Sequence, residues 1–167
     1  AEPVWPGDRP RWFPRECDWT VGCSYAGLPT APAPVRNLMG CNMAFRRRTL
    51  LDVGGFDTDL GRVGTLPVGC EETELCIRIA RSDPAARIIF DPDVRVRHHV
   101  SRNRTHVRYV LRRSFGEGVS KRQISGLVGA ADATSSERSY LTRTVPAAIM
   151  RYLRDGVTVE QRRTDPG

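Results

Sequence analysis

The sequence predicts an α/β fold in which a short mixed sheet is flanked by helices and followed by C-terminal helices. Two observations favour this class. Apolar residues recur at helical spacing in the stretch that begins at Glu71, and apolar runs of strand length lie before and after it. Runs of both kinds within 167 residues are typical of about one domain, which is long enough to bury a real core.

The chain is basic and rich in arginine. Its net charge is +7, and of its 26 basic residues only Lys121 is a lysine. Because arginine binds phosphate through two parallel hydrogen bonds, the balance favours anionic partners such as nucleotide diphosphates, lipid phosphates or nucleic acid. The five cysteines have no C-x-x-C spacing, which favours reduced thiols in a cytoplasmic protein over a zinc site.

The hydropathy pattern indicates a soluble chain. Mean hydropathy is −0.40, and no apolar run reaches the roughly 20 residues of a membrane span. The chain opens on Ala1 without the basic and apolar regions of a secretory signal, and without an initiating methionine. We therefore expect a fragment of a cytoplasmic protein.

The first half of the chain contains few long elements. Residues 1–36 are rich in proline, so we expect extended segments and loops there, with one short strand at 19–23. The elements expected next are a buried strand at 38–45, a helix at 46–53 that Gly54 and Gly55 end, and a loop at 61–69.

The second half is expected to be more regular. After the helix at Glu71, the expected elements are a strand at 87–90, a turn at 91–93, a strand at 94–100, a helix from Thr105 to about Gln123, a helix at 135–153 bent or split at Pro146, and a disordered tail at 156–167. The segments assigned from this pattern are an extended part (1–36), a central part (37–125), a helical extension (126–155) and the tail.

Three carboxylates lie within four positions at the start of the central helix. In the first turn, backbone N–H groups and the helix dipole favour negative charge, so the cluster can be purely structural. Alternatively, Glu71 or Glu72 is a catalytic base held at the helix N-terminus. Glu74 is the least suited to catalysis, because its spacing from Arg78 predicts an ion pair one turn apart.

Four motifs occur together in a familiar order. They are Gly40–Arg47 (GCNMAFRR), Val53–Asp57 (VGGFD), Glu71–Cys76 (EETELC), and Asp91–Asp93 (DPD) followed by His98 and His99. In this order they resemble the C-terminal half of a family 2 glycosyltransferase with the GT-A fold, over roughly residues 19–125.

The resemblance implies a nucleotide-sugar-dependent transferase, hexosyltransferase-like (EC 2.4), that acts on a cell-surface glycan or a lipid-linked acceptor. By position, it implies that Glu72 is the catalytic base and Glu71 the supporting acid. It implies that His98, or failing that His99, ligates the Mn²⁺ or Mg²⁺ that holds the donor diphosphate. It also implies a cytoplasmic protein, peripheral at the inner face of the cell membrane.

Further residues are expected to bind substrates. Asn42, Gly40 and the loop 61–69 would border the sugar site. Arg104, Arg108 and Arg112 step by four residues along the helix expected there, and would contact phosphate or the headgroups of an anionic membrane.

The expected chemistry is a single displacement. A sugar hydroxyl is a poor nucleophile, so a carboxylate must take its proton as it attacks the anomeric carbon. One base and no covalent intermediate imply inversion. The metal or an arginine cluster would stabilise the leaving diphosphate.

One part of the family pattern is missing. Members begin with a nucleotide-binding half that ends in an Asp-x-Asp motif. The two literal matches, at Asp57–Asp59 and Asp91–Asp93, look like turns. We therefore expect the acceptor-side half of a transferase, inactive alone. The alternatives are a non-catalytic remnant and a basic nucleic-acid-binding module. The second is disfavoured because aromatic residues do not interleave with the basic helix, so no specific nucleic acid is expected as a partner.

Overall fold

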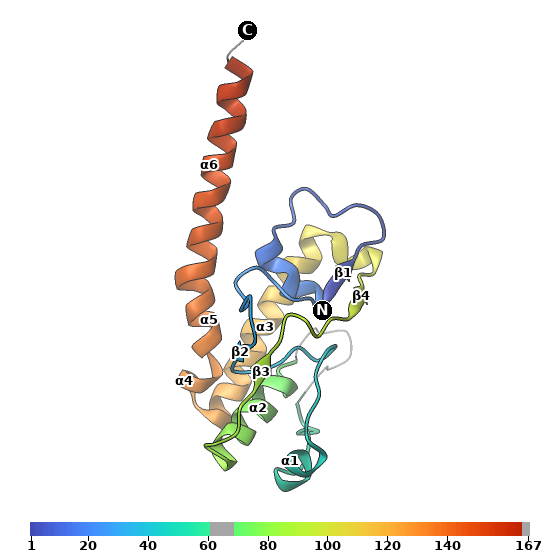
Figure 1. The fold of residues 1–167 in the computed structure, drawn as a ribbon, viewed down its shortest axis with the longest axis vertical. Helices are drawn as coiled ribbons and strands as arrows, with labels where there is room; N and C mark the ends of the chain where they lie inside the picture. The colour runs from blue at the N-terminus through green and yellow to red at the C-terminus, as the bar shows by residue number, and fades with distance from the viewer. Residues whose placement is uncertain (61–68, 165–167) are drawn as a thin grey trace. The chain divides into compact units, whose positions relative to one another are not determined.

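The computed structural model describes residues 1–60 and 69–164, which fall into two compact units, Ala1–Ser135 and Ser136–Gly167. The elements of the first unit are β1 (Glu2–Val4), the 3₁₀ helix η1 (Arg15–Val21), β2 (Ala33–Pro34), α1 (Arg47–Asp52), α2 (Glu71–Ser82), β3 (Ile89–Phe90), β4 (Arg97–His99), the 3₁₀ helix η2 (Arg102–Thr105), α3 (Val107–Val128) and α4 (Ala130–Ala133) (Figure 1).

The strands form two separate pairs. β1 runs parallel to β4, with Pro3 opposite His98, and β2 runs antiparallel to β3. The α/β class is therefore confirmed, but the strands described here do not join into the single mixed sheet that we expected. Each strand has only two or three residues, so it offers few hydrogen bonds for a further neighbour.

Two apolar clusters hold the first unit together. One joins α2 to α3 and α4 through buried Ile77, Ile124 and Ala133. The other lies between the N-terminal segment and the residue after β4, where Phe13 and Val100 are buried. Trp5 packs edge-on against Phe13, with the ring centroids 5.1 Å apart. The N-terminal aromatic residues Trp5 and Phe13 therefore belong to the core of this unit.

The strand expected at 19–23 is wrong, because η1 occupies this region. Gly22 caps η1 in the left-handed conformation (φ +87°), and its N–H reaches the carbonyls of Asp18 and Trp19. The glycine after Val21 is thus a helix-end signal, and the valine and threonine before it had favoured a strand.

The strand expected at 38–45 is also wrong. The N–H of Asn42 bonds to the carbonyl of Met39 at 2.9 Å, which closes a turn with Gly40 and Cys41 at its corner. Glycine and asparagine favour turns for steric and hydrogen-bonding reasons, and here they outweigh the apolar neighbours.

The helices follow the expected order. α1 and α2 occupy the expected stretches, and Gly54 and Gly55 adopt positive φ after α1. α3 is longer than expected and begins two residues later. Thr105, which we expected to cap this helix, does not do so, because its hydroxyl donates to the carbonyl of Arg102 and closes η2. The boundary placed at 125/126 falls inside α3, and the first unit continues to Ser135 because α4 packs on α3.

The second unit is helical. α5 (Ser135–Ser139), a π-helical turn (Tyr140–Thr144) and α6 (Val145–Thr164) follow one another. Pro146 lies in the first turn of α6, where a missing N–H is tolerated, so it ends no helix. α6 includes 156–164, which composition had indicated to be a disordered tail; Glu160 to Arg163 are good helix formers. The expected loop at 61–69 lies, except for Gly69, outside the described residues.

Candidate functional site

The site is built on the N-terminus of α2. Cys70 is the residue before the helix, and its backbone adopts the left-handed conformation (φ +80°). Among the described residues it is the one non-glycine with positive φ. Such a conformation costs about 1–2 kcal/mol and persists where surrounding contacts fix it. Glu71 and Glu72, both half-buried, are the first two residues of the helix that it starts.

The carboxylate of Glu72 lies against the turn at Gly40. A Cβ placed on Gly40 would lie 2.0 Å from Oε1 of Glu72 and 3.1 Å from its Cδ. Gly40 is not among the glycines with positive φ, so the absence of a side chain here matters for the space that the Glu72 carboxylate occupies. Two of the four motifs that carry the sequence resemblance, one around Gly40 and one at Glu71–Glu72, are thus in direct contact.

The surroundings of Glu72 disfavour its charge. Burial raises the pKa of Glu72 above its ordinary value, its own backbone N–H acts against this, and the nearby carboxylates of Glu71 and Glu117 raise it further. Arg113 lowers it. The neighbouring Glu71 buries its Oε2 atom without a hydrogen-bond partner among the described residues. The arrangement is a pair of crowded carboxylates, one of them suited to accept a proton.

Glu74 has the structural role that its spacing predicted. Its carboxylate pairs with Arg78 through two hydrogen bonds of 2.7 Å. The same guanidinium also donates to the carbonyls of Val53 and Gly55, at the end of α1. Arg78 therefore joins α2 to the C-terminus of α1, and Glu74 is occupied in holding it.

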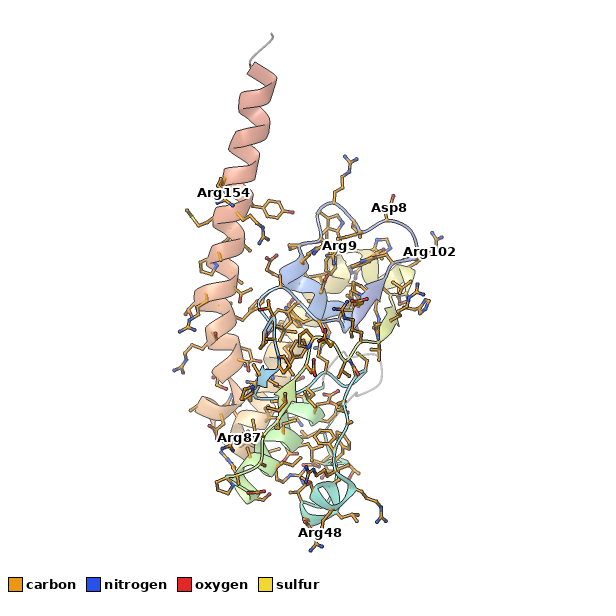
Figure 2. All side chains as sticks on the ribbon, in the orientation of Figure 1. Asp8, Arg9, Arg48, Arg87, Arg102 and Arg154 are labelled. Carbon is orange, nitrogen blue, oxygen red and sulfur yellow. The ribbon has the colours of Figure 1, made fainter. Side chains whose placement is uncertain are left out.

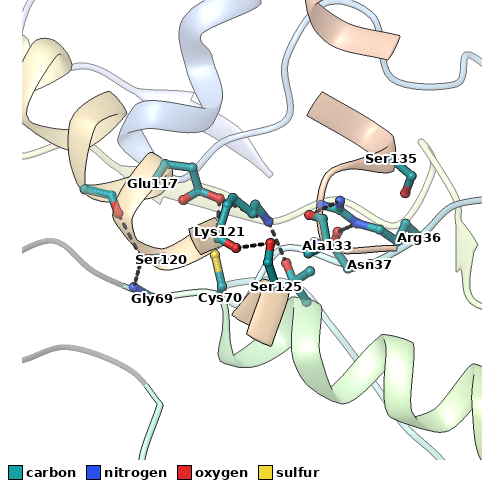
Figure 3. Close-up of polar contacts among 12 residues, drawn as sticks. Arg36, Asn37, Gly69, Cys70, Glu117, Ser120, Lys121, Ser125, Ala133 and Ser135 are labelled. Atoms are coloured by element: carbon teal, nitrogen blue, oxygen red, sulfur yellow. Dashed lines mark hydrogen bonds and ion pairs between the residues drawn. The ribbon is translucent and has the colours of Figure 1, made fainter. Parts of the chain in front are cut away.

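A polar group on α3 was missed by sequence analysis. Glu117 accepts from Lys121 at 3.2 Å and from the thiol of Cys70 at 3.3 Å (Figure 3). It also accepts from Arg113 at 2.8 Å. Two signals were present: Glu117 is the one acid between Arg95 and Arg122, and Lys121 is the one lysine of the chain. Their position against α2 depends on packing between distant segments, which spacing does not reveal.

His98 lies at a second place, beside the end of η1. Its Nε2 atom is buried without a hydrogen-bond partner and would lie 3.2 Å from a Cβ on Gly22. Burial lowers the pKa of His98, and the charge of Arg104 lowers it further, whereas a hydrogen bond with the backbone of Val21 acts in the opposite direction. The imidazole is therefore held neutral, as a metal ligand must be. His99, the alternative ligand, is exposed.

Cys41 links the surroundings of the two groups. Its thiol donates to the carbonyl of Gly22 at 3.1 Å, so the turn that contacts Glu72 through Gly40 also contacts the residue beside His98. Asn42 anchors the same turn, since its side-chain amide donates to the carbonyl of Val94 at 2.9 Å. In this structure Asn42 therefore holds the turn.

The described residues do not form a metal centre on their own. No three histidine, cysteine, aspartate or glutamate side chains gather there in a way that could hold an ion. His98 offers one unpartnered nitrogen, but the neighbouring charge of Arg104 opposes a cation. The Asp-x-Asp stretches are turns, as expected: Asp57 accepts from the N–H of Asp59, and Asp91 from that of Asp93, each at 2.9 Å.

The expected arginine stripe is interrupted. Arg104 belongs to η2, outside α3, and its guanidinium lies over the ring of Tyr109 at 5.8 Å. Arg108 and Arg112 lie on α3 and are exposed. Arg104 thus does not share a helix face with the other two, and it packs beside His98 and the end of η1.

Two cavities of the first unit lie away from the carboxylates. The larger, about 560 Å³, is over the C-terminal half of α2, where its walls include Phe45, Ile79 and Ile88. The smaller, about 280 Å³, lies between α2 and residues 34–36. Neither includes Glu72 or His98, so neither is the sugar-sized cleft expected beside the base.

Comparison with known proteins agrees with the resemblance in the motifs. The chain is 37% identical over 139 residues to the glucosyl-dolichyl phosphate glucuronosyltransferase of Haloferax volcanii. The aligned region covers 83% of this chain but 44% of that enzyme, so the chain spans less than half the length of this relative. No family model matches the chain, and no solved structure matches it significantly.

The match includes most of the first unit and therefore most of the motifs described above. The chain is thus related in sequence to a glycosyltransferase, which agrees with the resemblance inferred from its motifs.

Proposed function

We propose that this chain is the acceptor-side part of an inverting glycosyltransferase, in which Glu72 is the general base. The observation that carries the proposal is the half-buried carboxylate of Glu72 against Gly40, at the N-terminus of α2. Sequence relationship supports the reaction class, and this contact supports the residue.

The raised pKa of Glu72 suits a base. A carboxylate with a pKa well below the reaction pH is ionised but weakly basic, whereas one with a raised pKa takes a hydroxyl proton more readily. The base must be ionised to act, so transfer should increase as the pH rises through the pKa of Glu72. Glu71 remains the proposed supporting acid, since its unpartnered oxygen lies in the same place.

The acceptor is proposed to be a lipid-linked sugar. The relative from Haloferax volcanii is named for transfer of a glucuronosyl group to glucosyl-dolichyl phosphate. By analogy, the full-length protein would transfer a sugar from a nucleotide sugar to a sugar on a polyprenyl phosphate. Because this chain spans less than half of the relative, we expect it not to transfer by itself.

The proposed cofactor is Mn²⁺ or Mg²⁺, with His98 as one ligand. When bound, such an ion stabilises the charge of a leaving diphosphate. The described residues gather no group of three or more metal-ligating side chains, so the remaining ligands are proposed to come from the substrate or from other parts of the full-length protein.

A membrane surface is the proposed place of action. No helix in the described part of the chain is long and apolar enough to span a bilayer. α3 instead has an exposed apolar face, opposite its buried residues Gly116, Ser120 and Ile124. This outer face is formed by Val107, Leu111, Phe115 and Val119, which are 50%, 66%, 76% and 44% exposed.

Charge indicates what covers this outer face. Arg108 and Arg112 lie exposed beside it, and the one acid of α3, Glu117, is turned inward and paired with Arg113 and Lys121. Figure 2 shows Arg102, which precedes α3, also pointing outward. An apolar stripe with basic neighbours suits a helix lying in the plane of an anionic lipid surface.

The experiment is transfer by the full-length protein, with a nucleotide sugar as donor and a polyprenyl phosphate sugar as acceptor. Glu72→Gln should lower kcat by about 10² to 10⁴-fold and leave donor binding, measured by calorimetry, intact. Asp52→Asn, an exposed carboxylate on α1, is the control and should leave kcat unchanged. Unchanged turnover by Glu72→Gln would remove the base assignment.

The alternatives make different predictions. A non-catalytic remnant would bind no nucleotide sugar and show no transfer in any length of the protein. A nucleic-acid-binding module would bind random DNA with strong salt dependence and would not bind nucleotide sugars.

A further inference from the structure

The inner face of α3 contacts α2 on both sides of the two site carboxylates. Three hydrogen bonds cross between these segments: Gly69 N–H to Ser120 Oγ (2.9 Å), Cys70 Sγ to Glu117 Oε1 (3.3 Å), and Lys121 Nζ to Thr73 Oγ1 (3.2 Å) (Figure 3). Glu71 and Glu72 lie between the second and third of these contacts. Their backbone is therefore held at both ends by one face of one helix.

The left-handed backbone conformation of Cys70 requires contacts of this kind to maintain it. A residue with a side chain seldom adopts positive φ unless its neighbours impose it. Cys70 is buried, packs with Ile77 and Ile124, and donates its thiol proton to Glu117. The direction in which α2 leaves this residue, and hence the position of Glu72, follows from those contacts.

Glu117 is an ionised centre of the group. Its burial acts to raise its pKa, but Lys121 and Arg113 outweigh this and hold the pKa of Glu117 below its ordinary value. Lys121 is 6% exposed, and its Nζ lies 3.2 Å from this carboxylate, so the two buried charges form an ion pair. Ser120 adds a neutral contact, because it accepts from Gly69 while donating to the carbonyl of Gly116.

We propose that Glu117, Lys121 and Ser120 are positioning residues for Glu72, which fix the N-terminus of α2 so that the base is aimed at the turn of Gly40. This inference rests on the proposed function, and it adds α3 to the parts of the chain on which transfer depends. None of the three needs to touch substrate.

The charges that face Glu72 come from two helices. On α2 the charge is that of Glu71, and the neighbouring thiol of Cys76 is neutral because burial raises its pKa. On α3 the charges are those of Glu117 and Arg113, while the turn at Gly40 contributes no charged side chain. Glu117 and Arg113 act on the pKa of Glu72 in opposite directions. Neutralising one or the other therefore gives changes of opposite sign.

The first test is the pH profile of kcat in the full-length protein. Glu117→Gln should lower kcat about tenfold, since a base displaced by a fraction of an ångström acts poorly, and should move the acid limb to lower pH. Arg113→Gln should move that limb to higher pH. Arg122→Gln, an exposed neighbour on the same helix, is the control and should leave both the limb and kcat unchanged.

Conservative variants distinguish a loss of correct Glu72 position from a general loss of folding. Ser120→Ala removes the contact with Gly69 without changing any charge, so it should lower kcat with KM and the acid limb unchanged. Cys70→Ser keeps a hydrogen-bond donor for Glu117, whereas Cys70→Ala has none. Cys70→Ser should therefore retain more activity than Cys70→Ala. Thermal unfolding of each variant shows whether it is folded. If Glu117→Gln does not fold, the activities of Ser120→Ala and Arg113→Gln decide the question.

A second readout does not need transfer. Burial, followed by the charge of Glu117, raises the pKa of the Cys70 thiol to about 12, and Lys121 acts against this. Alkylation of Cys70, followed by peptide mass spectrometry, should therefore be faster in Glu117→Gln and slower in Lys121→Met than in the wild type. Exposed Cys41 is the internal control and should react equally in all three.

The outcomes are distinguishable. If the wild type transfers and Glu117→Gln and Ser120→Ala have wild-type kcat and pH profiles, the positioning role is wrong while the proposed function stands. If the wild type has no transferase activity, the proposed function fails and the positioning role fails with it. If Cys70 alkylation is unchanged in both variants, the contact between Cys70 and Glu117 is absent in solution, and the inference is overturned.

Discussion

Oε1 of Glu72 occupies the space in which a side chain at Gly40 would begin, since a Cβ there would lie only 2.0 Å from it. The conflicting atom, Oε1 of Glu72, is at the far end of a flexible side chain. The backbone at Gly40 can therefore stay in place while the carboxylate moves. A substitution at Gly40 therefore displaces the proposed base without opening the core.

Gly40→Ala should consequently separate activity from stability. We expect kcat to fall by about tenfold or more, because Glu72 must rotate away, while the unfolding free energy changes by less than about 1 kcal/mol. Gly7→Ala is the matched control, since no atom lies within 4 Å of its Cβ position. Chemical denaturation and transfer assays measure the two quantities. A large loss of stability with unchanged kcat would contradict the contact.

Arg78 should be a major stabilising residue of the first unit. Arg78→Ala removes the bidentate pair with Glu74 and leaves the carbonyls of Val53 and Gly55 without this donor. We expect a loss of about 2–3 kcal/mol, measured as a lower urea midpoint. Arg78→Lys should recover little of it, because an ammonium cannot make the same fork of bonds.

Arg48→Ala is the control for this prediction. Arg48 also pairs with a carboxylate four residues away, Asp52, but both side chains are largely exposed, and Figure 2 shows Arg48 pointing away from α1. We expect a change below about 0.5 kcal/mol. Equal losses for Arg48→Ala and Arg78→Ala would show that the contacts of Arg78 with α1 do not contribute.

The parts of the fold that sequence analysis predicted are those with local signals. α2 follows from its apolar spacing and its acidic first turn, and the end of α1 follows from two adjacent glycines. The errors arise where local signals compete. Residues 19–23 contain strand-forming residues, but Gly22 provides a helix cap, and the turn at Gly40 lies in an apolar run.

The site shows the same division. The pair of Glu74 and Arg78 follows from a spacing of four. The spacing alone left Glu71 and Glu72 as equal candidates for the base, and the choice of Glu72, which rests on the family resemblance, stays a prediction. Contacts between distant segments could not be selected in this way. Lys121 reaches Thr73 across 48 positions, and His98 lies beside Gly22 because β4 pairs with β1.

The raised pKa of Glu72 has a consequence for stability. A carboxyl group whose pKa is higher in the folded than in the unfolded state favours folding when protonated, so this contribution is lost as the pH rises through its folded pKa. Glu72→Gln, which is neutral at every pH, should therefore have a higher Tm than the wild type at pH 7. The difference should disappear below the ordinary pKa of glutamate.

Thermal unfolding from pH 3 to pH 8 checks this prediction. Glu2→Gln is the control, because Glu2 is exposed and its pair with Arg95 is at the surface. A Tm for Glu72→Gln that is equal to or below that of the wild type at pH 7 would show that Glu72 is solvated as a charge, which argues against a base in this environment.

Binding of the full-length protein to vesicles tests the outer face of α3. Leu111→Ser with Phe115→Ser should reduce binding to anionic vesicles about tenfold or more, because two largely exposed apolar side chains would no longer enter the interface. Arg108→Gln should reduce it about fivefold, the effect of about 1 kcal/mol for each basic residue near such a surface. Leu51→Ser, on α1, is the control, because Leu51 is as exposed as Leu111.

Lipid charge and salt decide whether this face binds a membrane. Binding should weaken in neutral vesicles and with rising salt, because screening reduces the contribution of the arginines while that of the apolar side chains remains. Equal binding of the wild type and the double variant, or a change in oligomeric state without vesicles, would assign the face to a protein contact. Salt-sensitive binding to random DNA, with none to vesicles, would assign Arg108 and its basic neighbours to nucleic acid instead.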